Sequence, residues 1–503
     1  MPPAVLRGIG RGVEKESLRV RADGGLAGTP HPAALGSALT HPNITTDFSE
    51  AQPELITGVH ANAEDCVAEL TRIHQFVTRN IGAEMLWCAS MPCGLPGDDA
   101  IPIGHYGGSN IGRAKSVYRM GLAYRYGRRM QAISGIHYNF SLPGLSSARY
   151  FALIRNFRRH GWLLFYLFGA SPAVCSSFVE GRRHELLTLS EYTRYLPHAT
   201  TLRMGRLGYQ SDAQSSIAAS FNSLEAYGKS LEEALTLSYP PYEKIGVRGP
   251  GGEYRQLATT LIQIENEFYG KIRPKRVIRP GERPLHALRE RGVEYVEVRL
   301  MDLDPFAPVG IEAPAMRLLD VFLLYCALCD SPPDTPGEIA AIARNQDRVA
   351  MRGREPGLRL ERGGQRVELA EWGGQLLLEC GPVAAALDAA YGGGAYREAL
   401  AAALGAIGDP AVTPSARVLA AMKRDYGDSY TRLVLAHSAR HDAALRALPF
   451  SAAEEANFTR LARESLDEQR QIEATDTVDF ETFRQRYLSP ERLRVEGPSS
   501  ASA

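Results

Sequence analysis

Residues Val293–Leu300 read VEYVEVRL, and apolar and polar side chains alternate along them. In an extended strand, successive side chains point to opposite faces. Val296 and Val298 therefore share one face, and Glu297 and Arg299 share the other. The pattern predicts a sheet strand whose apolar side packs on a core, while its charged side is solvated or lines a site.

Two other stretches combine strand periodicity with unusual polar content. In Val13–Val20 (VEKESLRV), Glu14 and Glu16 fall on one face. In residues 136–142 (IHYNFSL), His137, Asn139 and Ser141 lie on one face. Side chains two residues apart on a strand are separated by ~6.5 Å. These stretches predict a second and a third strand with one polar face.

Long segments with helical periodicity lie between these strands, at residues 62–80 and 150–164. After the proline-rich SPPDTPGE (331–338) the composition shifts to Ala, Leu, Arg and Glu. We therefore expect an α+β fold in which helices back the sheet. The expected division is a catalytic α+β body over 1–330, a mainly helical part packed on it over 331–494, and a disordered tail over 495–503.

The charge balance excludes some classes of function. The 503 residues contain 57 Lys and Arg against 57 Asp and Glu, so the formal net charge is 0. A protein that coats nucleic acid or an anionic membrane would show a basic surplus. The longest apolar runs, 162–168 and 321–329, are far shorter than the ~20 residues of a membrane span, and the N-terminus has no signal-peptide core. We predict a cytoplasmic protein with neither kind of partner.

Cysteine usage points to a reducing compartment. The chain has seven cysteines, an odd number that does not match a disulfide framework. Cys326 and Cys329 lie in an apolar run without a second pair at zinc-ribbon spacing. We favour buried structural thiols over a redox or metal pair.

The acidic residues suggest a metal site. Glu14 and Glu16 are placed to hold divalent ions, and Glu297 beside Arg299 suits a metal ligand next to a phosphate-binding guanidinium. Asp47, Glu50 and Glu54 surround a probable turn at Pro53 in TTDFSEAQPELIT. The alternative is that exposed strand faces carry charge for solubility, which is common for any single pair.

No phosphate-binding loop is present in the sequence. Gly228-Lys229-Ser230 resembles the end of one, but Ser223 stands where a glycine is required. A nucleotide would then be held by metals and scattered cations. The segment 271–291 has eight Lys and Arg against two Glu, and Lys275 and Arg276 are its best candidates for nucleotide binding. A solvated loop is the alternative for the distal arginines.

Taken together, the sequence closely resembles the proteobacterial type of glutamate–cysteine ligase. The matching segments, in order along the chain, are GIGRGVEKESLRV, HPAALGSALTHPNITTDFSEAQPELIT, SMPCG, YGGSNIGRAKSVYRMGLAYRYG, MQAISGIHYNFSLP, LFGASPAVCSSF, LIQIENEFYGKIRPKR and GVEYVEVRLMDLDPF.

The resemblance implies a curved, mostly antiparallel sheet that forms a cradle like that of glutamine synthetase. It implies ATP-dependent ligation of the L-glutamate γ-carboxyl to the L-cysteine amine through γ-glutamyl phosphate, the first step of glutathione biosynthesis. Mg²⁺ or Mn²⁺ would assist, and the enzyme would be a monomer.

The resemblance also implies roles for particular residues. Those matching the family's metal site are Glu14, Glu16, Asp47, Glu54, Glu297 and His137. For His137, contact with phosphate and an ordinary place in the core are the alternatives. Those matching its catalytic groups are Arg119, Arg299 and Glu297. Those matching its substrate pocket are Phe48, Tyr118, Leu122, Gln131, Arg203, Tyr209 and Tyr269.

Three other functions stay open at this stage. A related ATP-dependent carboxylate–amine ligase with a different amine acceptor would have the same acid cluster. A nucleotide- or metal-binding regulatory protein would bind ADP without turnover. A glycosidase with paired carboxylates ranks last, because it has no use for Arg299 beside Glu297.

Overall fold

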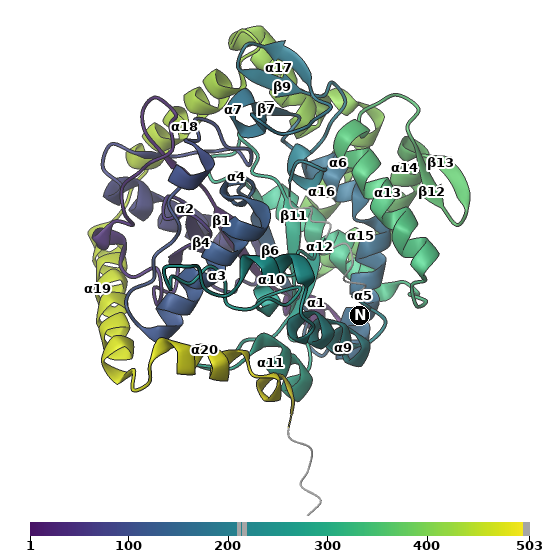
Figure 1. The fold of residues 1–503 in the computed structure, drawn as a ribbon. Helices are drawn as coiled ribbons and strands as arrows, with labels where there is room; N and C mark the ends of the chain where they lie inside the picture. The colour runs from purple at the N-terminus through teal and green to yellow at the C-terminus, as the bar shows by residue number, and fades with distance from the viewer. Residues whose placement is uncertain (209–212, 214–218, 496–503) are drawn as a thin grey trace, which may run out of the picture.

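A six-stranded sheet forms the centre of the molecule (Figure 1). The computed structural model describes residues 1–208, 213 and 219–495. All neighbouring strands of this sheet run antiparallel. Their order is β10 (Ile272–Lys275), β11 (Tyr295–Met301), β6 (Ile136–Ser141), β1 (Gly10–Glu16), β4 (Pro53–Ile56) and β3 (Ile44–Thr46).

The strand register brings the polar residues of different strands opposite one another. Facing residues of an antiparallel pair have Cβ atoms only ~5 Å apart, so their side chains interact directly. The facing pairs are Glu14–His137, Glu16–Glu54, Asn139–Glu297 and Arg273–Glu297.

The apolar face of the sheet packs on helices. Val296 and Val298 are fully buried, as the alternation in their strand predicts. The helices in contact with the strands include α2 (Ala63–Asn80), α5 (Ser147–His160), α6 (Trp162–Phe168) and α12 (Ala313–Leu328). This arrangement is α+β, which confirms the expected fold class at that level.

Two expected elements differ from those observed. The stretch 13–20 is not one strand: β1 ends at Glu16, and Arg19–Val20 (β2) pairs with Met85–Leu86 (β5) in a separate sheet. The segment 150–164 is split at Gly161 into α5 and α6. A Cβ at Gly161 would lie 2.7 Å from the Phe157 carbonyl oxygen, so only glycine fits this break.

Smaller elements complete the first 330 residues. A three-stranded sheet has the order β7 (Ala173–Cys175), β9 (Thr193–Tyr195) and β8 (Leu187–Ser190). The remaining α-helices described there are α1 (Pro3–Arg7), α3 (Asn110–Tyr126), α4 (Arg128–Gln131), α7 (Ser176–Val179), α9 (Leu224–Thr236), α10 (Pro240–Ile245) and α11 (Pro284–Arg291).

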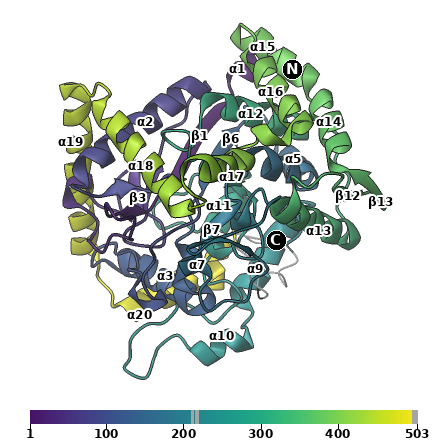
Figure 2. The same cartoon turned by 90° about the horizontal axis from the view of Figure 1, so that it is seen from above.

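The C-terminal part is mainly helical and lies around the body: in Figure 1, α17 is at the top, α13 and α14 are on the right, α19 is on the left and α20 is at the base. Figure 2 shows the same arrangement from above. Helices α15 and α16 contact α12, α18 and α19 contact α2, and α20 contacts α3. The elements are α13 (Pro336–Arg352), the hairpin β12 (Arg359–Arg362) and β13 (Gln365–Glu368), α14 (Leu369–Glu379), α15 (Gly381–Tyr391), α16 (Ala395–Gly408), α17 (Pro414–Asp425), α18 (Tyr430–Ala447), α19 (Ala452–Thr475) and α20 (Phe480–Leu488).

The domain boundaries proposed from composition stay predictions. One hydrophobic core includes Leu323 before residue 331 and Leu387 after it. All but the first residue of the predicted tail 495–503 lies outside the described residues. Within the described ranges, no helix is both long enough and apolar enough to cross a bilayer.

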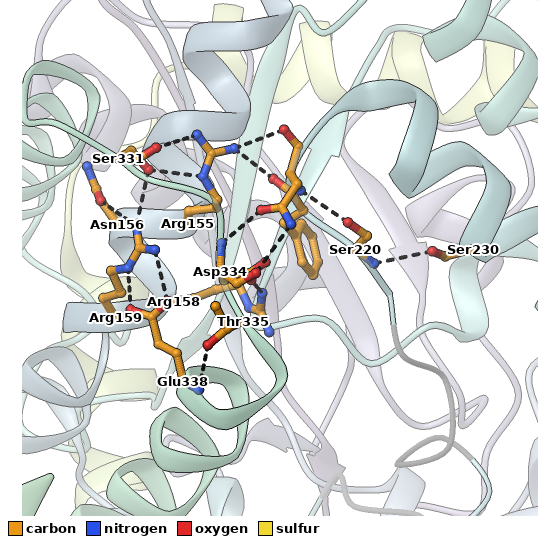
Figure 3. A network of polar contacts seen from close by, with 12 residues as sticks. Arg155, Asn156, Arg158, Arg159, Ser220, Ser230, Ser331, Asp334, Thr335 and Glu338 are labelled. Carbon is orange, nitrogen blue, oxygen red and sulfur yellow. Dashed lines mark hydrogen bonds and ion pairs between the residues drawn. The ribbon is translucent and has the colours of Figure 1, made fainter. Parts of the chain in front are cut away.

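Arginines of α5 hold the chain where it enters the C-terminal part (Figure 3). Arg158 Nη1 lies 2.5 Å from Asp334 Oδ2, and Arg159 Nε lies 2.7 Å from Glu338 Oε1. Arg155 donates to the Phe221 carbonyl at 3.0 Å. The proline-rich segment 331–338 is therefore tied to the body by ion pairs and hydrogen bonds.

Candidate active site

Carboxylates from several strands surround His137 on the polar face of the sheet. The Nδ1 atom of His137 lies 3.2 Å from Glu14 Oε2 and 3.6 Å from Glu297 Oε1, and its Nε2 atom lies 3.5 Å from Glu16 Oε1. Two sets of potential ligand atoms each fall within 4.8 Å: Glu14, His137 and Glu297, and Glu16, Glu54 and His137. We call these five residues the acid cluster.

Neighbouring groups orient two of these carboxylates. Asn139 Nδ2 donates to Glu14 Oε1 at 2.9 Å. The backbone N–H of Gly135 donates to Glu16 Oε2 at 2.7 Å. Both donors come from β6 or the residue before it, so the strand that carries His137 also fixes the acids on β1.

Cations border the acid cluster at Glu297, whose side chain is 1% exposed. Arg299 Nη1 donates to Glu297 Oε1 at 2.9 Å, and Lys275 Nζ lies 3.5 Å from Oε2. Burial by itself would raise the pKa of Glu297, but Lys275, Arg299 and Arg273 lower it well below its usual value. Glu297 is therefore an anion surrounded by positive charge.

The other side of the cluster has an excess of negative charge. Burial, and then the charge of Asp47, raise the pKa of Glu16 to about 8. Burial and the charges of Glu14, Asp47 and Glu16 raise the pKa of Glu54 well above its usual value. Carboxylates this close repel one another unless a proton or a cation lies between them.

The donor atoms fit a divalent cation such as Mg²⁺ or Mn²⁺. Glu297 Oε2 and Asn139 Oδ1 are buried and have no hydrogen-bond partner among the residues that the structure describes. Buried polar atoms normally have partners, so such atoms indicate a group that binds there. A set made mainly of carboxylate oxygens is the chemistry that hard cations prefer.

The structure brings together all but one of the predicted metal ligands. Asp47 follows β3 and affects the pKa of Glu16 and Glu54, but it belongs to neither ligand set. A third set on the surface, Glu282, His286 and Glu290, is already neutralised, because Arg291 pairs with Glu282 at 2.7 Å and Arg279 with Glu290 at 3.4 Å.

Arg119 lies near the site without touching the acid cluster. It is on α3, and its guanidinium donates to the carbonyls of Asp47, Lys115 and Thr46. The guanidinium carbon lies 4.4 Å from the ring centroid of Tyr106. Its predicted catalytic role remains a prediction.

Most of the predicted substrate residues converge. Phe48, Tyr118 and Leu122 belong to one hydrophobic cluster, and Tyr269 packs against it. Gln131 Nε2 donates to the Tyr269 hydroxyl at 2.8 Å. Predicted residue Tyr209 lies outside the described residues.

A small pocket brings two predicted substrate residues, Arg203 and Tyr269, together with His137 of the acid cluster. Its volume is about 50 Å³. Its lining consists of His137, Arg203, Met204, Tyr269, Gly270, Lys271 and Arg299. Arg203 Nη2 donates to the Arg299 carbonyl at 3.0 Å, so the two guanidinium-bearing residues are adjacent.

A larger pocket of about 880 Å³ lies beside β10. Lys275 and Arg276 line it, together with Arg273 and an apolar wall that includes Tyr227, Leu231, Ile278 and Leu285. Arg276 is held by Glu294, 3.4 Å from its Nε, and donates to the Arg291 carbonyl. The pocket pairs a cationic edge with an apolar wall.

The distal arginines of the 271–291 segment are not a free basic patch. They form ion pairs whose N–O distances run from 2.6 to 3.4 Å. The pairs are Arg279–Glu290, Arg283–Glu265, Arg289–Glu232 and Arg291–Glu282.

Sequence reasoning missed Arg273 and Asn139 as site residues, and it did not find the apolar wall of the larger pocket. Arg273 lies two residues before Lys275 on the same strand, so the spacing argument applied to Glu14 and Glu16 would have found it. The apolar wall had no such signal, because its residues come from α9, α11 and the loop after β10.

Comparison with known proteins agrees with this geometry. The family model described as "Glutamate-cysteine ligase" matches residues 2–349. A glutamate–cysteine ligase of Azotobacter vinelandii is 50% identical over 505 residues, covering 96% of this chain and 95% of that protein. One from Pseudomonas aeruginosa (strain LESB58) is 50% identical over 494 residues, with coverages of 95% and 93%.

Solved structures show the same fold. A glutamate–cysteine ligase from Francisella tularensis, solved in complex with AMP, superposes with a TM-score of 0.91 at 35% identity, covering 95% of this chain and 97% of that one. A bifunctional glutathione synthetase from Pasteurella multocida superposes with a TM-score of 0.72 at 26% identity, covering 92% and 57%. The chain therefore belongs to the glutamate–cysteine ligase family.

Proposed function

We propose that this chain joins the γ-carboxyl of L-glutamate to the amine of L-cysteine at the expense of ATP, the first step of glutathione synthesis. The observation that carries the proposal is the acid cluster bordered by Arg299, Lys275 and Arg273. A reaction between anionic glutamate and anionic ATP needs both charge signs within one site. The names and 50% identity of the relatives support the same activity.

The larger pocket beside β10 is the proposed ATP site. Its apolar wall of Tyr227, Leu231 and Ile278 suits an adenine ring, and Lys275 and Arg276 suit phosphates. The AMP in the Francisella tularensis structure supports a nucleotide on this scaffold. The pocket reaches the acid cluster through Lys275, which contacts Glu297.

Glu14, Glu16, Glu54, Glu297 and His137 would hold Mg²⁺ or Mn²⁺, with Asp47 close by. When bound, the ion neutralises phosphate charge and polarises phosphoryl oxygens. Burial and then repulsion among these acids raise the pKa of Glu16 and Glu54, and a bound cation would offset that repulsion. We therefore expect EDTA to abolish turnover and added Mg²⁺ or Mn²⁺ to restore it.

The chain's own residues then position two displacements. In the first, a glutamate γ-carboxylate oxygen attacks the γ-phosphorus of ATP, and the bond to ADP breaks. In the second, the cysteine amine attacks the resulting acyl carbon, phosphate leaves and the amine loses a proton. Arg299, fixed by Glu297 at 2.9 Å, is placed to stabilise charge on the transferring phosphoryl group, with Arg119 as a second candidate.

The small pocket beside Arg299 is the proposed amino-acid site. Phe48, Tyr118 and Leu122 give the neighbouring cluster an apolar surface suited to a thiol, and Gln131 and Tyr269 add hydrogen-bonding groups. Between cysteine and an analogue of similar size, such a pocket gives a difference in binding free energy of only ~1–3 kcal/mol.

Three finer points belong to the proposal. The antiparallel sheet with its polar face supports a glutamine synthetase-like cradle. The seven free cysteines suit the reducing cytoplasm. A monomer is expected, and light scattering of the purified protein tests it.

The deciding experiment measures ADP release with glutamate, ATP and Mg²⁺ across several amines. Cysteine should give a higher kcat/KM than 2-aminobutyrate or other small amines. Equal values would favour the related ligase with a different acceptor. ADP binding without glutamate-dependent phosphate release would favour a regulatory protein instead.

A further inference from the structure

Lys271 lines the small pocket together with Arg203 and Arg299, but unlike them it has no assigned part in substrate binding or phosphoryl transfer. It lies directly before β10, and its carbonyl accepts a hydrogen bond from the Arg299 N–H at 2.9 Å. The pocket lining places Lys271 with Arg203 and Arg299. Among the described residues, this lining contains these three cations and no carboxylate.

The two charged groups that act on Lys271 each have an ion-pair partner of their own. Asp347 of α13 is its acidic neighbour; Asp347 Oδ2 lies 3.3 Å from Arg206 Nη2, and its Oδ1 is buried without a hydrogen-bond partner among the described residues. Arg158 of α5, the neighbouring cation, is paired with Asp334 at 2.5 Å, as Figure 3 shows. Within the described chain, no carboxylate oxygen lies within 4 Å of Lys271 Nζ, although the side chain is partly buried.

Apolar side chains make up most of the other surroundings of Lys271. Its Nζ lies 6.0 Å from the ring centroid of Phe165. Lys271 also lines a second cavity of about 170 Å³, whose walls are mostly apolar and include Phe157 and Phe221, with Arg158 and Gln346 as polar members. Burial, followed by the charge of Arg158, lowers the pKa of Lys271 to about 8. A desolvated ammonium without a counter-ion gains most from an anion that enters the pocket.

We propose that Lys271 is a further substrate-binding residue, whose ammonium group forms an ion pair with the α-carboxylate of one of the two amino acids. The proposal rests on the proposed function, since both glutamate and cysteine carry such a carboxylate. Lys271 would act beside Arg203 and Arg299, and would hold the substrate without taking part in bond making.

The test compares the Michaelis constants of Lys271→Met, Lys271→Arg and wild type for glutamate, cysteine and ATP. Lys271→Met keeps the length of the side chain and removes its charge, so the KM for one amino acid should rise about tenfold or more. The KM for ATP should change less than twofold, and Lys271→Arg should restore most of the loss. Lys423→Met, at an exposed lysine of α17, is the matched control and should behave as wild type.

Amide analogues identify the source of the carboxylate. If Lys271 binds the cysteine carboxylate, wild type should bind L-cysteinamide weakly and Lys271→Met should weaken it no further. If Lys271 instead binds the α-carboxylate of glutamate, wild type should bind the glutamate α-amide weakly, and Lys271→Met should weaken that binding no further.

Two results would overturn the proposal. One is a KM for both amino acids within twofold of wild type in Lys271→Met. The other is an equal rise in KM for all three substrates that Lys271→Arg does not rescue, which is the signature of a packing role.

The proposed function is judged separately, from wild-type turnover alone. Were wild type inactive, calorimetric binding of each amino acid to wild type and Lys271→Met would decide the role of Lys271.

Discussion

Glu297 is the residue at which the opposite charges of the site meet. Its two oxygens face different partners: Oε1 accepts from Arg299, and Oε2 lies near Lys275 but has no hydrogen-bond partner. A buried carboxylate in this position can bind a cation while it holds a guanidinium in place. Substitutions at Glu297 or Arg299 should therefore disturb both the cation site and the guanidinium.

Replacing Glu297 with Gln should lower kcat by at least about a hundredfold, because the amide keeps the shape but loses the charge that holds Arg299 and a metal. The melting temperature should change by only a few degrees. Glu290→Gln on α11 is the control, since the ion pairs that Glu290 forms with described residues are to Arg279 and Arg291, outside the acid cluster. A Glu297→Gln enzyme with kcat within tenfold of wild type would remove Glu297 from the site.

Arg299→Lys should also be severe, although the charge is retained. Arg299 Nη1 lies 2.9 Å from Glu297 Oε1 and 3.4 Å from His137 Nδ1, so one nitrogen makes both contacts and the rest of the planar guanidinium is left to meet phosphoryl oxygens. The ammonium of lysine is a point charge and cannot reproduce that planar fork. We expect kcat to fall by about tenfold or more in steady-state assays. Full activity in this variant would mean that only the net charge at this position matters.

Among the secondary-structure elements, a buried ion pair ties the sheet to its supporting helix. Asp320 of α12 accepts from Arg11 Nε of β1 at 2.6 Å and from the Tyr138 hydroxyl of β6 at 2.6 Å. Arg11 and Asp320 are both 0% exposed. The strands that carry Glu14 and His137 are therefore anchored to one helix from the side opposite the acid cluster.

Asp320→Ala should reduce the free energy of unfolding by about 3–5 kcal/mol, because it leaves the buried Arg11 charge without its counter-ion. Tyr138→Phe removes only one hydrogen bond and should cost about 1 kcal/mol. Urea denaturation followed by circular dichroism measures both values. If Asp320→Ala cost no more than Tyr138→Phe, the ion pair would not be what holds the strands to α12.

Across the whole molecule, buried histidines should determine stability in mild acid. Burial lowers the pKa of His31, His41, His160 and His437 to about 4. In His41 two hydrogen bonds act in the same direction as burial, since its Nδ1 accepts from two backbone N–H groups and cannot carry a proton while it does so. The unfolded chain protonates these histidines near pH 6.5, before the folded chain does.

Stability should therefore fall as the pH drops from 6.5 towards 4, because the unfolded state binds more protons in that window. Buried acids with raised pKa values oppose this trend, because they favour the folded state at lower pH; they are Glu16, Glu54, Asp302, Asp304 and Asp320. They are outnumbered, because burial also lowers the pKa of His74, His137 and His441, which brings the histidines to seven. Urea unfolding at pH 7, 6 and 5 should show a loss on the order of 1–3 kcal/mol per pH unit below 6.

His160→Gln removes one of these titrating groups. The slope of the unfolding free energy against pH should therefore fall by the contribution of roughly one proton. Equal unfolding free energies at pH 7 and pH 5 would show that protonation of the buried histidines does not control stability in this range.

Much of the fold and the site follows from local sequence. The alternation of residues 293–300 predicted both faces of β11, and the pattern in residues 62–80 predicted α2, which begins one residue later, after Asn62 as its N-cap. Spacing placed Glu14 beside Glu16 and Glu297 beside Arg299. Ordered segments along the chain predicted the family, which the comparisons confirm.

The amino-acid sequence by itself determined which side chains share a strand face, because that depends only on the two-residue period of an extended chain. Tertiary structure alone decided that Glu16 faces Glu54, that the acids of β1 and β11 meet at His137, and that Lys271 shares a pocket with Arg203. Strand register and helix packing depend on contacts between residues far apart in the chain. Local charge patterns and overall neutrality carry no information about those contacts, so the convergence of the site appears only in the folded molecule.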